Sequence, residues 1–98
     1  MKPAILRPYH APEVIGVAEA AQRAGRSERT IREWCALHQI GRRIGGQWAV
    51  SQTALDMFLH GDSEVLEAYL AGDRTSQGVL SYYERRSILP PSTDPGAQ

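Results

Sequence analysis

The sequence is poor in the residues that build covalent cross-links, metal sites and membrane spans. Its 98 residues include one cysteine, Cys35, and three scattered histidines, His10, His38 and His60. A single thiol excludes an internal disulfide, and no Cys/His ligand spacing is present. No apolar run approaches the roughly 18 residues that a membrane span requires. We therefore expect a cytoplasmic protein in a reducing compartment, with no membrane, metal or cofactor.

Recognisable catalytic groupings are also missing. No Ser-His-Asp or Cys-His arrangement can be assembled from the sequence, and a chain this short has little room for an elaborate enzyme pocket. Three prolines interrupt the first 14 residues, which is unlike a signal peptide. The expectation is a small non-enzymatic protein.

The chain also has no net charge, but its charged residues are distributed unevenly. Residues 1–50 carry eight Lys or Arg and four Glu, a net charge of +4, whereas residues 51–98 carry three Arg and seven acids, a net charge of −4. Such asymmetry suggests a polyanionic partner for the first half. The second half could face solvent or the first half of a neighbouring copy.

The positions of proline and glycine indicate that the chain has four parts. Residues 1–13 are expected to form an extended arm, because each proline favours extended backbone before it. Residues 14–61 should form a compact domain and residues 62–89 further helices. Residues 90–98, rich in proline and small polar residues, are expected to be a disordered tail.

Two short helices joined by a tight turn are predicted within residues 16–38. The first should begin near Gly16 and end at Gly25, a position suited to positive φ. Ser27 can cap the second helix. An apolar face recurs on that helix at i, i+3, i+4 and i+7, broadened by Leu37; its members are Ile31, Trp34, Cys35 and His38. The pattern is a helix-turn-helix.

A two-stranded ribbon is predicted next, over residues 40–44 and 47–50. Gly45 and Gly46 supply the positive φ values of a two-residue hairpin turn. Ser51 should cap a third helix with an apolar stripe of Leu55, Phe58 and Leu59. Two more helices should follow, over residues 64–71, with Asp62 or Ser63 as the cap, and over residues 76–89. The fold class is thus mainly α with a small two-stranded β-hairpin, a winged helix-turn-helix followed by C-terminal helices.

This arrangement can bind double-stranded DNA. A helix fits the major groove, and the ribbon beside it, a wing, can follow the backbone. Arginine suits both roles because its planar fork matches phosphate oxygens and guanine O6/N7. The candidate DNA-binding residues are Ser27, Glu28, Arg29, Thr30, Arg32 and Glu33 on the helix, and Arg42, Arg43, Gly46 and Gln47 on the wing. Glu28 and Glu33 repel phosphate. Either can accept a hydrogen bond from cytosine N4, orient an arginine, or be a surface residue without a role in binding. The sequence leaves these three alternatives open.

The segment Val14 to Gly61 resembles the small winged helix-turn-helix domain of the excisionase family, relatives of the MerR-type DNA-binding domain. The matching motifs are Glu19-Ala20-Ala21, Gly25, Ser27, Thr30-Ile31, Gly45-Gly46-Gln47-Trp48 and Ser51. The sequence departs from the family pattern at Gly16, His38, Gln47 and Ala49.

The resemblance implies an architectural protein that binds neighbouring DNA sites in several copies and bends the DNA. Such proteins help a tyrosine- or serine-type integrase to excise a prophage or mobile element and catalyse nothing themselves. A bacterial or phage-encoded protein associated with the nucleoid is implied. A small transcriptional regulator, a phage terminase small subunit and a module that does not bind DNA are the alternatives.

Self-association is expected to involve the C-terminal helices, unless they simply complete the core. They hold many large apolar groups for so small a body, and exposed apolar patches tend to mark contacts. A head-to-tail contact would let copies follow one another along DNA. The candidate residues are Tyr69, Leu70, Tyr82, Tyr83, Arg85 and Arg86.

Overall fold

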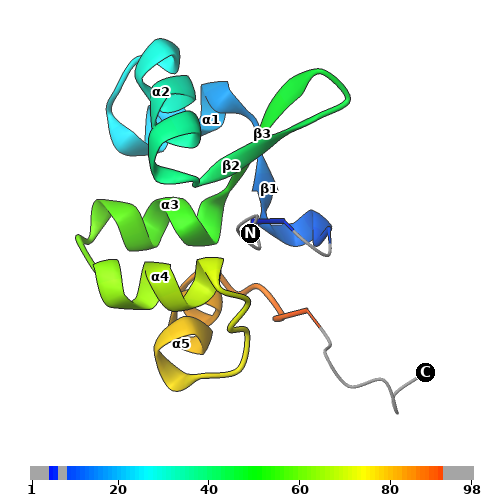
Figure 1. Ribbon diagram of the computed structural model, residues 1–98, viewed down its shortest axis with the longest axis vertical. Coiled ribbons are helices and arrows are strands. Elements are labelled where there is room, and N and C mark those ends of the chain that lie inside the picture. The colour runs from blue at the N-terminus through cyan, green and yellow to red at the C-terminus, as the bar shows by residue number, and fades with distance from the viewer. Residues whose placement is uncertain (1–4, 7–8, 92–98) are drawn as a thin grey trace.

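The protein is described here by a computed structural model that covers residues 5–6 and 9–91. The helix-turn-helix and its wing lie at one end, and the C-terminal helices stack below them (Figure 1). The described part of the chain comprises the elements η1 (Ala11–Glu13), β1 (Val14–Ile15), α1 (Val17–Ala24), α2 (Glu28–His38), β2 (Gly41–Ile44), β3 (Gln47–Ser51), α3 (Gln52–Leu59), α4 (Ser63–Leu70) and α5 (Gln77–Arg85). This confirms the predicted fold class, with one more strand than expected.

Helices α1 and α2 form the predicted helix-turn-helix. Gly25 ends α1 with φ of 66°, and the Ser27 hydroxyl accepts a hydrogen bond of 3.1 Å from the Thr30 amide at the start of α2. Ile31 and Cys35 are buried, as their spacing predicts. Leu37 is 74% exposed, so the expected broadening of this face is wrong. At 100° per residue Leu37 lies about 120° from Ile31, beyond the buried face.

The sheet has three antiparallel strands in the order β1-β3-β2, where the sequence predicted two. Gly45 and Gly46 have φ of 59° and 83° and form the predicted turn between β2 and β3. The additional strand, β1, pairs Val14 with Ser51. The wing therefore starts from a sheet that is anchored on both sides of β3.

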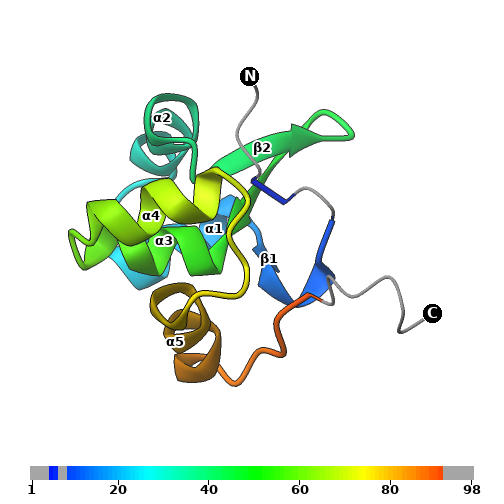
Figure 2. The same ribbon diagram turned by 60° about the horizontal axis from the view of Figure 1, so that its bottom comes forward.

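Helices α4 and α5 pack against α3 (Figure 2), and their buried side chains complete the core. Tyr69 and Tyr83 have no exposed surface and Tyr82 is 2% exposed. The prediction that these side chains form an exposed apolar patch is therefore wrong. Their apolar rings pack inside, while their hydroxyl groups hydrogen-bond to carboxylates of the same chain: Tyr69 and Tyr83 to Glu13, and Tyr82 to Asp62.

A buried carboxylate joins the two ends of the chain. Glu13 is 1% exposed and accepts from the Tyr69 hydroxyl, from the Tyr83 hydroxyl at 2.8 Å and from the Ser51 hydroxyl at 3.2 Å. Burial, followed by the negative charge of Glu13, raises the pKa of Tyr69; burial, then Tyr69 and Glu13, raises that of Tyr83. The three donors satisfy a charge that would otherwise be costly to bury.

The expectation of an extended arm over residues 1–13 is wrong for its described part. Ile5 and Leu6 are 3% and 1% exposed, and η1 places Glu13 in the core. Burying these apolar groups stabilises the docked conformation. The rest of the arm, residues 1–4 and 7–8, and most of the expected tail, residues 92–98, lie outside the described residues.

No helix among the described residues is long and apolar enough to cross a membrane. Within the same residues, no group of three His, Cys, Asp or Glu side chains is placed to hold a metal ion.

Candidate nucleic-acid interface

Helix α2 turns a polar face to solvent on the side opposite its buried residues. The Arg29 side chain is 85% exposed, and those of Arg32 and Glu33 are 49% and 56% exposed. Their spacing of three and four places them on one face, because α-helical side chains repeat every 3.6 residues. This face is free to approach a duplex.

Both arginines of this face are paired with glutamates one turn away. Arg29 Nε lies 3.6 Å from Glu33 Oε2, and Arg32 Nη1 lies 3.6 Å from Glu28 Oε1. Exposed pairs of this kind contribute only about 0.3–0.5 kcal/mol. The arginines can therefore exchange these partners for DNA at low cost.

Ser27 and Thr30 serve mainly to start the helix. The Ser27 hydroxyl donates to Thr30 Oγ1 at 3.1 Å and accepts from the Thr30 amide. The cap fixes where α2 begins and thus which residues enter its first turn.

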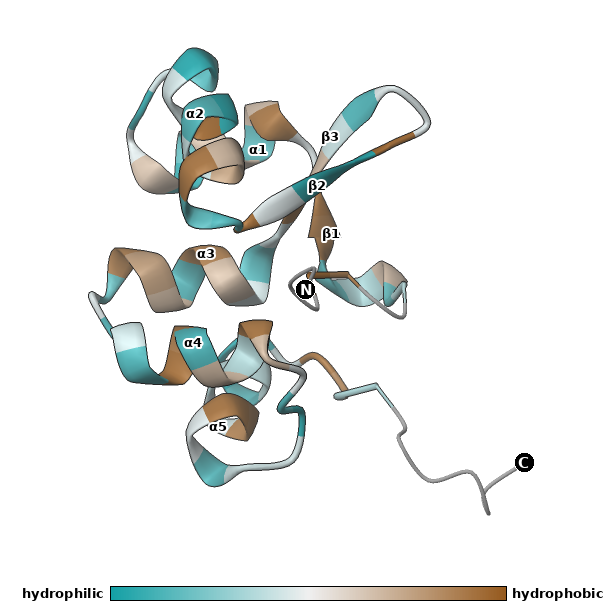
Figure 3. Ribbon diagram, in the orientation of Figure 1, coloured by the Kyte–Doolittle hydropathy of each residue, from teal (hydrophilic) through white to brown (hydrophobic). Residues whose placement is uncertain are grey.

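The wing places one arginine beside α2. Arg43 pairs with Trp48 across the two strands, and its guanidinium carbon lies 5.7 Å from the Trp48 ring centroid. Arg43 also donates to the Gly46 carbonyl at 2.8 Å. Figure 3 shows the hydrophilic middle of β2 in teal and its apolar end at the turn in brown. The turn at Gly46 thus helps to hold the arginine side chain in place.

A groove separates α2 from the wing. It is lined by Glu28 and Arg32 of α2, by Arg43, Gly46, Gln47 and Trp48 of the wing, and by Gly16 and Val17 at the start of α1. Two guanidinium groups, which carry only donors, thus border one concave surface. The groove thus offers hydrogen-bond donors to the phosphate or base acceptors of a DNA duplex.

Residues 14–63 match the family described as the helix-turn-helix domain. The chain belongs to this family. The matched segment covers α1, α2, the three strands and α3, which makes this a DNA-binding helix-turn-helix protein. No curated protein and no solved structure matches the chain significantly.

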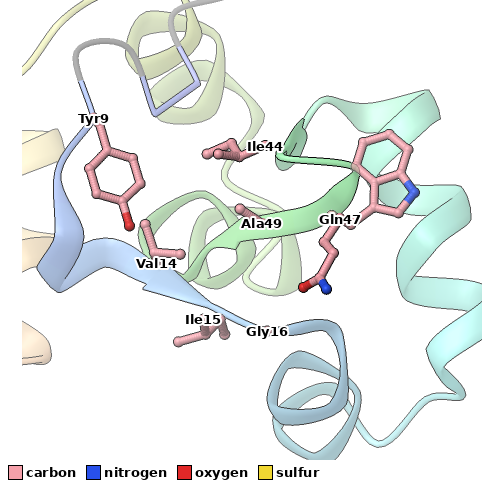
Figure 4. Close-up of a pocket in the computed structure, with 8 residues that line it drawn as sticks. Tyr9, Val14, Ile15, Gly16, Ile44, Gln47 and Ala49 are labelled. Atoms are coloured by element: carbon pink, nitrogen blue, oxygen red, sulfur yellow. The ribbon is translucent and has the colours of Figure 1, made fainter.

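Arg42 does not join Arg43 on the helix-turn-helix face. Its Nη2 donates to the Leu6 carbonyl at 3.2 Å, and the residue is half-buried. Neighbouring residues of a strand point to opposite faces, so Arg42 lies on the side of the wing turned away from α2. A hollow on that side is lined by Tyr9, Val14, Ile44 and Gln47, among others (Figure 4). Grouping Arg42 with Arg43 in one binding surface was therefore wrong.

Gln47 borders both hollows of the wing because it follows the turn at the tip. It can reach DNA from either side of the ribbon. Its amide both donates and accepts, so it suits phosphate and base contacts alike.

Three residues of the helix-turn-helix region were missed by sequence reasoning. Ala36 is exposed and lies on the face of Arg29 and Arg32, seven and four residues further along. Its methyl group could contact a thymine methyl. Arg26 is exposed in the turn before α2, and half-buried Trp48 lines the groove. Helical spacing was the signal for Ala36.

Cys35 lies under this interface as a small buried side chain. Burial raises the pKa of its thiol to about 11, so the thiol stays protonated at neutral pH. It acts as an apolar contact between α2 and β2.

The arginines predicted for self-association are occupied within the chain. Arg86 Nε and Nη2 donate to the Asp56 carboxylate at 2.7 and 2.8 Å, and the Arg85 guanidinium lies 4.4 Å from the Tyr82 ring centroid. Leu70 is half-buried. Among the described residues, the exposed large apolar side chains are Tyr9, Leu37, Leu59 and Leu89, none of which belongs to the predicted set.

Proposed function

We propose that this protein is a sequence-directed, architectural DNA-binding protein that acts as an excisionase, or recombination directionality factor. Its partners would be double-stranded DNA and a tyrosine- or serine-type integrase. The observation that carries DNA recognition is the groove in which Arg32 of α2 and Arg43 of the wing face the same space. The more specific role rests on the resemblance of residues 14–61 to the excisionase family.

In the proposed docking, α2 enters the major groove and the wing follows the neighbouring backbone. Arg29, Arg32 and Glu33 point toward base edges, and Arg43 toward a phosphate. Phosphate contacts fix the register of the protein, whereas base contacts select the sequence. Glu28 and Gln47 border the space between these two sets of contacts.

The protein would supply geometry rather than chemistry. Bound copies would bend the DNA between their sites, and the energy of bending would be offset by the additional contacts. The integrase would perform the strand exchange. We propose no catalytic residue and no cofactor for this chain.

Footprinting on DNA that flanks the gene's own locus tests the proposal. We expect protection at repeated sites beside an integrase attachment site, and an increase in excision when the protein is added to integrase and a plasmid carrying that site. Protection of a promoter with no effect on recombination would indicate a transcriptional regulator instead. Protection of a packaging site would indicate a terminase-like role, and either result would overturn the excisionase proposal.

A further inference from the structure

The DNA-facing side of α2 carries as many acids as bases. Glu28 and Glu33 flank Arg29 and Arg32 in the sequence, and all four side chains are at least 49% exposed. Each acid lies where phosphates of a docked duplex would repel it. The whole chain has no net charge to compensate for this repulsion. This surface therefore does not attract DNA strongly regardless of its sequence.

Glu28 has the more constrained position of the two acids. It lines the groove between α2 and the wing together with Arg32 and Arg43, so it faces the space assigned to DNA. It is also the first residue of α2. The N-terminal residues of a recognition helix are those that contact base edges. A carboxylate at the first residue of α2 would therefore lie close to base edges as well as to the DNA backbone.

The chemistry of the Glu28–Arg32 pair is complementary to a particular set of base edges. An ionised carboxylate only accepts hydrogen bonds, and a guanidinium only donates them. In the major groove, cytosine N4 donates, whereas guanine O6 and N7 accept. The two groups lie 3.6 Å apart, side by side, and can address neighbouring positions of a G·C-containing step.

We propose that Glu28 is a specificity-determining residue that accepts a hydrogen bond from the exocyclic amino group of a base, cytosine N4 first of all. On DNA without that donor, the Glu28 carboxylate gains no hydrogen bond from a base and still repels nearby phosphates, which weakens binding. Glu28 thus selects the cognate site partly by disfavouring every other site. The inference rests on the proposed DNA binding and adds the feature of the site that is read.

A purely structural role for Glu28 makes a different prediction. An acid in the first turn interacts favourably with the helix dipole. A Glu four residues before an Arg also stabilises a helix more than the reverse order does. Loss of those effects would lower the stability of the protein and leave its choice of sequence unchanged. Sequence preference is therefore the measurement that separates the two roles.

The test uses the full chain and a pool of duplexes with a randomised core. Wild type, Glu28→Gln and the control Glu67→Gln are each taken through rounds of selection, and the affinity for the best wild-type duplex and for the unselected pool is then measured. Glutamine keeps the size of the side chain and removes its charge. Glu67 is exposed on α4, away from the groove, so the control makes the same change in net charge. Thermal unfolding checks that each variant is folded.

We expect Glu28→Gln to bind the unselected pool more tightly and to reduce the ratio of cognate to pool affinity about tenfold or more, the effect of one good base contact. One G·C position in the selected sites should become degenerate or change to A·T, because glutamine pairs well with adenine. Glu67→Gln should select the wild-type sites. Glu28→Gln selecting the same sites with the same ratio as Glu67→Gln would overturn the inference alone. Wild type selecting no sequence at all would instead refute sequence-directed binding, and the inference with it.

Discussion

Arg29 and Arg32 are the residues of α2 on which base recognition depends most directly. Each is held only by an exposed ion pair at 3.6 Å, so removing either should hardly affect folding. We expect Arg29→Ala or Arg32→Ala to weaken cognate binding by about 1–3 kcal/mol where the arginine makes a bidentate contact with guanine. Titration of a labelled duplex by fluorescence anisotropy measures this loss. Unchanged affinity in both variants would rule out this face of α2 as the docking surface.

Arg43 should behave differently, because it lies on the wing beside Trp48 and faces the backbone in the proposed docking. Arg43→Ala should weaken cognate and non-cognate binding by similar factors. It should also lower the slope of log K against log salt by about one, the signature of one lost phosphate contact. A matched salt titration of Arg42→Ala serves as the control, since Arg42 points to the other side of the ribbon. A loss confined to the cognate site would instead make Arg43 a base-reading residue.

The buried tyrosines make the stability of the fold sensitive to alkaline pH. Free tyrosine has a pKa of 10.0, and burial beside Glu13 raises the pKa of Tyr69 and Tyr83 above it. Above pH 10 the unfolded chain loses these protons while the folded protein keeps them. The contribution of these tyrosines to stability should thus be constant below pH 10 and fall above it, by up to about 1.4 kcal/mol per pH unit for each tyrosine. Cys35, with its pKa raised to about 11, adds a smaller decline between pH 9 and 11.

Urea unfolding between pH 7 and 11 measures this decline, and Tyr83→Phe isolates one tyrosine. The variant should have a shallower decline above pH 10. It should also be less stable at neutral pH by about 1–3 kcal/mol, because the buried Glu13 carboxylate loses a donor. An unchanged slope in Tyr83→Phe would show that this tyrosine titrates normally in the folded state.

At the scale of elements, the distance between α2 and the wing is set by Gly41. A Cβ atom at this position would lie 2.5 Å from the Ala49 carbonyl oxygen and 2.8 Å from Cys35 Sγ. Gly41→Ala should therefore force β2 away from its neighbours. We expect a loss of about 1–3 kcal/mol of stability, as for other overpacked sites, and weaker DNA binding because the groove changes shape.

Thermal unfolding and DNA titration of Gly41→Ala measure both effects, and a double variant provides the control. Cys35→Ala removes one of the two close contacts, so Gly41→Ala/Cys35→Ala should be less destabilised than the sum of the single variants. Full additivity would show that the contact between α2 and β2 does not limit this position.

Elements with local signals were predictable from the sequence, and elements that depend on distant partners were not. Gly25, Ser27 and the Gly45–Gly46 turn fix their own neighbourhood, so the helix-turn-helix and the hairpin follow from them. Strand β1 has two residues and pairs with β3, whose residues come more than thirty positions later. Nothing within the sequence around Val14 indicates that pairing.

The same distinction holds for the functional surface. Helical spacing correctly predicted that Arg29 and Arg32 are exposed, and strand alternation places Arg42 and Arg43 on opposite sides of the ribbon. The tyrosines were misassigned to the surface for another reason. Their acceptor, Glu13, precedes Tyr69 by 56 positions and Tyr83 by 70, so neither partner reveals the other in the sequence.

At the scale of the whole molecule, the core does not end with the family-matched segment. Residues 14–63 match the helix-turn-helix domain, yet Leu66, Tyr69, Val79 and Tyr83 pack in the same core cluster as Ile31 and Val50. Glu13, one residue before the match, links the sheet to α4 and α5 through its three hydrogen bonds. The C-terminal helices therefore support the fold that presents α2 and the wing.

A chain that ends at Gly61 should accordingly lose its cooperative unfolding transition. The truncation removes α4 and α5, exposes apolar groups of α3 such as Leu55 and Met57, and leaves the Glu13 carboxylate with Ser51 alone. Single domains are stable by only about 5–15 kcal/mol, and the burial of one large apolar side chain contributes about 1.5–3 kcal/mol. Removing Leu66, Tyr69, Val79 and Tyr83 together thus eliminates a large part of the total. Circular dichroism during heating measures the transition, with a chain ending at Pro91 as the control that should melt like the full protein. A truncated chain that melts at the full-length temperature would show that residues 62–91 form a separate unit after all.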